Sequence, residues 1–71
     1  MSTHNHSLDN DDREAVDAIV GSFINGQKRQ MTDQIGRMGW SEFTYEFERY
    51  DELSGQQKVE VLCTAIRLED L

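Results

Sequence analysis

The chain has 71 residues, no proline, one cysteine and a net charge of −7 from 14 acidic and 7 basic residues. This length predicts one domain with a small core. A single cysteine excludes an internal disulfide, and no apolar run is long enough to span a bilayer. Because the N-terminus lacks the features of a secretory signal, we expect a cytoplasmic protein.

The charges are segregated along the chain. Residues 9–17 and residues 42–52 each carry five acids and one arginine, whereas residues 28–37 are net positive. Such a charge distribution repels nucleic acid and lipid headgroups and attracts basic protein surfaces. We therefore expect no direct binding of nucleic acid or membranes, and we expect the basic segment to pair internally with the acids.

The N-terminal residues 1–8 are polar apart from Met1 and Leu8, which predicts a mobile tail before a single helical domain over 9–71. If Met1 is removed, Ser2-Thr3-His4 presents an amine, two amides and an imidazole, a ligand set for Cu(II) or Ni(II). The alternative, which we favour, is a polar tail in which His4 occurs by chance. We expect no metal and no cofactor.

The first half of the domain predicts two helices, over about 10–24 and 27–38. The first begins near Asp9–Asp11 and has one apolar face, formed by Val16, Ile19, Val20 and Phe23. Asn25-Gly26 ends it, because this pair adopts the left-handed conformation. The second helix buries Met31, Ile35 and Met38 and stops at Gly39. One long helix through Gly26 is the alternative, at a cost of about 1 kcal/mol; we favour the break.

The second half predicts helices over about 41–52 and 54–68, which makes the fold all-α, a small bundle of three to four short helices. Ser41 is the expected N-cap of the third, whose aromatic stripe of Trp40, Phe43, Phe47 and Tyr50 should be mostly core. Ser54 and Gln57 form a capping box for the fourth helix. Its predicted buried face consists of Val59, Leu62, Cys63 and Ile66, with Cys63 as a small buried hydrophobe.

Motifs for nucleophilic, phosphate-binding or metal-dependent catalysis do not occur in the sequence. The adjacent acids Asp51 and Glu52 are typical of a solvated surface rather than of acid/base chemistry. The sequence thus predicts that the protein is not an enzyme.

Tyr45 lies off the aromatic stripe, so it should be exposed, with acidic residues around it. An aromatic anchor with an acidic rim favours binding of a basic protein surface. The rigid third helix should hold these charges better than the segment near the tail. The predicted partner-binding residues are Glu42, Tyr45, Glu46, Glu48, Asp51 and Glu52.

Residues 22–31, SFINGQKRQM, resemble the helix–Asn-Gly–helix segments of small phage, prophage and plasmid proteins. In its size, acidity and lack of catalytic residues, the chain is similar to inhibitors that mobile elements use against host defence, such as anti-CRISPR and anti-restriction proteins. The resemblance implies stoichiometric binding to a host protein with a basic, nucleic-acid-handling surface. It carries over no family-specific residues.

A second interpretation stays open, in which the protein is a small structural or regulatory homo-oligomer and its charge serves only solubility. A short chain without a disulfide or a metal often needs a partner subunit to supplement its core. A homodimer is therefore also an expectation.

Overall fold

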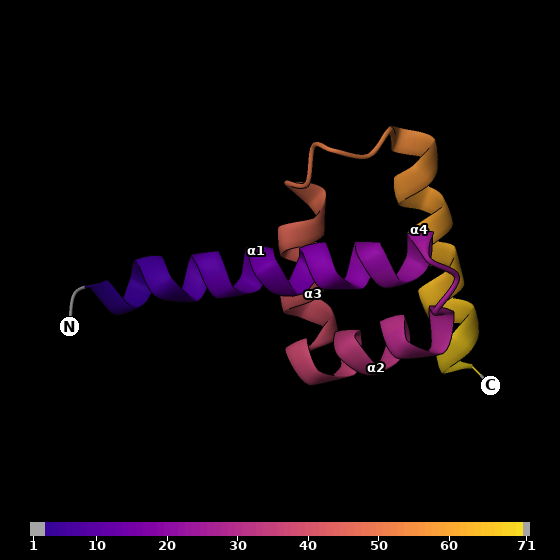
Figure 1. Ribbon diagram of the computed structural model, residues 1–71, viewed down its shortest axis with the longest axis horizontal. Helices are drawn as coiled ribbons and strands as arrows, with labels where there is room; N and C mark the ends of the chain where they lie inside the picture. Colours follow the sequence, from indigo (N-terminus) through magenta and orange to yellow (C-terminus); the bar gives the residue numbers. More distant parts are fainter. Residues whose placement is uncertain (1–2, 71) are drawn as a thin grey trace.

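The computed structural model describes the backbone of residues 3–70 and the side chains of residues 11–70. Within this range it contains the helices α1 (Thr3–Ile24), α2 (Lys28–Met38), α3 (Trp40–Glu48) and α4 (Gly55–Glu69), and no strand. The predicted all-α fold is confirmed. As Figure 1 shows, α2 folds back along α1, α3 crosses α1, and the N-terminal part of α1 extends beyond the other helices.

The predicted break after α1 is confirmed. Gly26 has a φ of +79°, and the N–H groups of Gly26 and Gln27 donate to the carbonyls of Phe23 and Ser22. This bond pair is the Schellman motif, in which a left-handed glycine satisfies the last carbonyls of a helix. Gly39 likewise ends α2 as predicted, with a φ of +101°.

Two helix starts differ from the predictions. α1 begins at Thr3, before Asp9–Asp11, because neither proline nor glycine interrupts the chain between residues 3 and 20. The mobility of residues 1–8 stays a prediction. Ser41 is not the N-cap of α3, because Gly39 redirects the chain and its carbonyl already accepts the N–H of Phe43 at 2.9 Å.

α3 also ends at Glu48, four residues before the predicted position 52. The N–H groups of Arg49 and Tyr50 donate to carbonyls three residues earlier, and these tight turns stop the helix. The capping box of α4 is confirmed: Gln57 N–H donates to Ser54 Oγ at 3.2 Å, and Ser54 N–H donates to Gln57 Oε1 at 3.0 Å.

All four helices contribute to one core, and the aromatic stripe lies in it as predicted. Phe43 and Phe47 are 0% and 2% exposed, with their rings stacked at a centroid distance of 5.1 Å. Trp40, Phe23 and Met38 are only half-buried at its edge. The buried apolar side chains of this core are Val16, Ile19, Val20, Met31, Ile35, Phe43, Phe47, Tyr50, Val61 and Ala65.

The predicted buried face of α4 is wrong. The structure buries Val61 and Ala65, whereas Val59, Cys63 and Ile66 are exposed and Leu62 is half-buried. The helix carries two apolar rows, and Val61, Ala65 and Leu68 recur at the same helical spacing as the predicted row. The small Ala65 side chain lets α4 approach its neighbours closely, which favours burial of the second row. Cys63 is consequently a solvent-facing thiol.

None of the described helices is both long and apolar enough to cross a membrane.

Candidate protein-binding surface

The two acidic segments are separated in sequence but meet in space, because α3 crosses α1 (Figure 1). Asp12 of the first segment and Glu42 of the second line the same open hollow. Arg13 of the first segment pairs with Glu52 of the second. The fold therefore joins the segments at two places.

The hollow has a volume of about 430 Å³ and lies among α1, α2 and α3. Its apolar lining comes from Ala15, Ala18 and Met38, and its polar lining from Asp12, Gln34, Arg37 and Glu42. Two carboxylates and one guanidinium leave the lining with a net charge of −1 beside apolar side chains, which suits a long side chain that ends in a positive charge, such as lysine or arginine.

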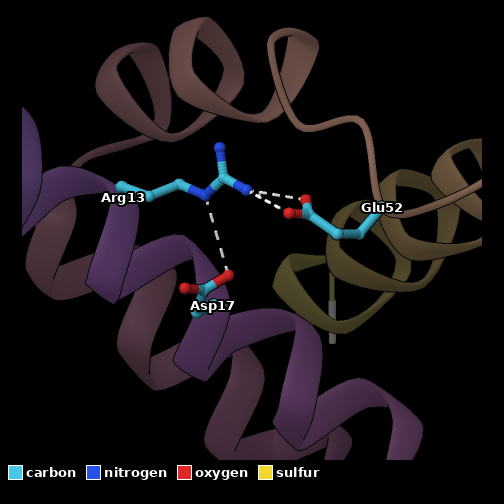
Figure 2. A network of polar contacts seen from close by, with 3 residues as sticks. All are labelled: Arg13, Asp17 and Glu52. Carbon is cyan, nitrogen blue, oxygen red and sulfur yellow. Dashed lines mark hydrogen bonds and ion pairs between the residues drawn. The ribbon is translucent and has the colours of Figure 1, made fainter.

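Arg13 connects α1 to the segment between α3 and α4 (Figure 2). Its Nη2 donates to both carboxylate oxygens of Glu52, at 2.5 and 2.7 Å, and its Nε lies 3.8 Å from Asp17 Oδ1. The guanidinium also lies over the ring of Tyr50, with its Cζ 4.6 Å from the centroid. Since Arg13 and Glu52 are both partly solvated, we expect their pair to contribute about 1 kcal/mol or less.

Tyr50 is 7% exposed and lies next to Asp17 in this network. Burial, together with the neighbouring Asp17 carboxylate, raises the pKa of the Tyr50 phenol from 10.0 to about 12. The phenol is therefore neutral at physiological pH.

The predicted partner-binding residues fall into two groups, those that are exposed and available to a partner and those whose carboxylate already lies against an arginine. Glu42, Tyr45 and Glu48 form an exposed row along α3 at a spacing of three residues, and Asp51 follows it, also exposed. Tyr45 is 62% exposed, with Arg49 Cζ 5.5 Å from its ring centroid. Glu52 is exposed, but Arg13 neutralises it.

Glu46 does not face solvent, contrary to the prediction that it forms part of an exposed wall. It is 7% exposed, and its Oε2 lies 3.4 Å from Nη1 of Arg49. α3 turns this position toward the body of the protein, one turn from the buried Phe43 and beside Phe47. We define the acidic surface as the remaining predicted residues Glu42, Tyr45, Glu48 and Asp51, together with Asp12, which shares the hollow with Glu42.

Sequence reasoning did not assign Asp12, Arg13 or Arg37 to this region. Arg13 is the single base in the first acidic segment, which was an available signal, but no local pattern pairs Asp12 with Glu42. The expected internal pairing of the basic segment is not found among the ion pairs of residues 11–70, which involve as bases only Arg13 and Arg49. Arg37 lines the hollow together with Asp12 and Glu42, but like Lys28 and Arg29 it forms no ion pair with any side chain among residues 11–70.

Among the described residues, no group of three or more His, Cys, Asp or Glu side chains could hold a metal ion. The Ser2-Thr3-His4 motif lies outside the residues whose side chains the structure describes.

Comparison of the chain with models of protein families gave no match, and comparisons with curated proteins and with solved structures gave none either.

Proposed function

We propose that the protein is a non-enzymatic binding module whose acidic surface docks on a basic surface of a partner protein. The partner chemistry that fits best is a surface that handles nucleic acid. A mobile-element inhibitor of a host defence protein would work in this way.

The main support is the convergence of both acidic segments around α3. Asp12 and Glu42 share one hollow, and Tyr45 is 62% exposed between Glu42 and Glu48. An exposed aromatic ring supplies contact area at low entropic cost, and the surrounding carboxylates speed the approach of a basic partner. The open hollow next to Glu42 offers space for a basic side chain of that partner.

The test is capture of partners from a bacterial lysate at low and high salt, with elution by double-stranded DNA. The proposal expects a basic partner that high salt or DNA releases. Glu42→Lys/Glu48→Lys should lower capture about tenfold or more, since mutation of charged contacts mainly slows association. Asp33→Lys/Glu69→Lys is the matched control, because it changes the net charge equally at exposed positions on other helices. Capture that is insensitive to salt, or equally sensitive to both variants, would exclude the acidic surface.

A second candidate function, a small homo-oligomeric protein, is favoured by a different observation. Val59 and Ile66 are 58% and 49% exposed on α4, on the side that the core does not use.

A further inference from the structure

α4 presents a row of apolar side chains to solvent. Val59, Cys63 and Ile66 recur at spacings of four and three residues, and the half-buried Leu62 borders them. Single exposed apolar residues are common on protein surfaces, but three in register on one helix form the seam by which helices pair. The row lies opposite Val61 and Ala65, which pack into the core. It is therefore free to meet another molecule.

The charge of α4 distinguishes it from the other helices. Lys58 and Arg67 balance Glu60 and Glu69, so the helix is neutral in a chain of net charge −7. Two copies of the chain repel one another through the acidic residues of α1 and α3. Close approach along α4 avoids this cost, so a second copy fits this face better than it fits the acidic surface.

The sequence of α4 is complementary to itself in the antiparallel direction. Val59 and Ile66 lie about equally far from Cys63 along the helix, and so do Glu60 and Arg67. When two such helices run antiparallel about Cys63, Val59 meets Ile66 of the second copy. Glu60 and Arg67 lie on the same side of the apolar row. In a symmetric antiparallel pair this side of one helix lies next to the same side of the other helix, so Glu60 meets Arg67 of the second copy.

We propose that the protein forms a symmetric homodimer in which α4 packs antiparallel against α4 of a second copy, with the two Cys63 side chains at the two-fold axis. The contact is isologous, so it closes at two copies. A single pair of short helices falls at the small end of specific interfaces, below about 1,200 Å² in total. The dimer is consequently weak and dissociates in the micromolar range.

Cys63 is the single cysteine of the chain, which makes it a reporter that needs no engineering. Sedimentation of the full chain should show a monomer–dimer equilibrium, and a short bis-maleimide should link Cys63 to its copy in the dimer. Val59→Gln/Ile66→Gln should weaken dimerisation about 100-fold or more, because each dimer loses four apolar side chains. The same variant retains Cys63, so it measures cross-linking by random collision.

Ile24→Gln is the matched control, because Ile24 is 66% exposed at the end of α1, outside the α4 row. It should leave dimerisation unchanged. Glutamine is a good helix former, so helical circular dichroism should show each variant folded.

A charge swap tests the direction of the helices. Glu60→Arg places like charges at both flanking contacts and should weaken the dimer several-fold, whereas Glu60→Arg/Arg67→Glu should restore it. A chain that stays monomeric at hundreds of micromolar overturns the proposal. So does a dimer that survives Val59→Gln/Ile66→Gln, which would indicate contact between basic α2 and the acidic surface of another copy. Failure of the swap to restore association overturns the antiparallel arrangement.

Discussion

Arg13 belongs to the first acidic segment, yet its side chain binds Glu52 of the second, 39 residues away. It also covers the ring of Tyr50 and lies near Asp17. One guanidinium thus brings the segment after α3 against α1 and neutralises a carboxylate that would otherwise add to the repulsion between the two segments. Arg49, directly after α3, has a similar place between Tyr45 and the buried Glu46. At the residue scale, the side chains of Arg13 and Arg49 therefore determine which carboxylates near them are neutralised and which still face solvent as negative charges.

Tyr50 gives this network a measurable dependence on pH. Its pKa is raised from 10.0 to about 12, so between these values the phenol ionises in the unfolded chain but not in the folded one. The unfolded state then binds fewer protons, and the free energy of unfolding should fall as pH rises from 10 toward 12. Tyr50→Phe should remove this decline, as measured by urea unfolding across that range. Tyr45→Phe, at an exposed position, is the control and should decline like the wild type; parallel curves for all three proteins would contradict the assignment.

At the element scale, glycines decide where α1 and α2 stop. Gly26 adopts a φ of +79° and has no neighbouring atom within 4 Å of the place where a Cβ would lie. Gly21 lies inside α1 with equally open space around its Cβ position. The two positions therefore differ in backbone conformation and not in steric room.

Alanine substitution separates these two roles. Gly26→Ala should lower the free energy of unfolding by about 1–2 kcal/mol, because an L-residue is strained in the left-handed conformation. Gly21→Ala should instead raise it by about 0.5–1 kcal/mol, since alanine is the better helix former. Both changes can be measured by urea unfolding. If Gly26→Ala were stabilising, the helix would run through position 26, as the alternative reading of the sequence allowed.

The helix breaks and the Ser54 cap could be predicted because their causes are local, in glycines and in a four-residue capping pattern. The buried face of α4 could not be predicted, because the helix carries two apolar rows, one from Val59 to Ile66 and one from Val61 to Leu68. Only packing against the other helices selects which row is buried. The burial of Glu46 and the early end of α3 depend on how α3 lies against its neighbours. Asp12 and Glu42 line the same hollow because α1 and α3 cross, and no pattern within either segment indicates that crossing.

At the scale of the whole molecule, the fold gathers like charges instead of separating them. Asp12 of α1 and Glu42 of α3 line the same hollow, while α2 is basic and α4 is neutral. If the acidic residues served only solubility, this arrangement would have no advantage, because charges dispersed over the surface keep a protein soluble equally well and repel one another less. Concentrated repulsion lowers the stability of the free protein and is relieved when a basic surface covers it.

Repulsion between these carboxylates should make the free energy of unfolding depend on salt concentration. The Debye length shortens from about 30 Å at 0.01 M to about 8 Å at 0.15 M ionic strength, so added salt screens repulsion between the carboxylates. We expect the free energy of unfolding to rise by about 0.5 kcal/mol over this range, in line with the size of exposed charge interactions. Asp12→Asn/Glu42→Gln should raise stability at low salt and flatten the response, because it removes two like charges that line the same hollow. Glu52→Gln should do the reverse and lower stability, because Glu52 is held by Arg13. If the wild-type protein instead loses stability as salt increases, attraction between opposite charges outweighs repulsion between the carboxylates. The acidic surface would then lack the repulsion that binding of a basic partner is proposed to relieve.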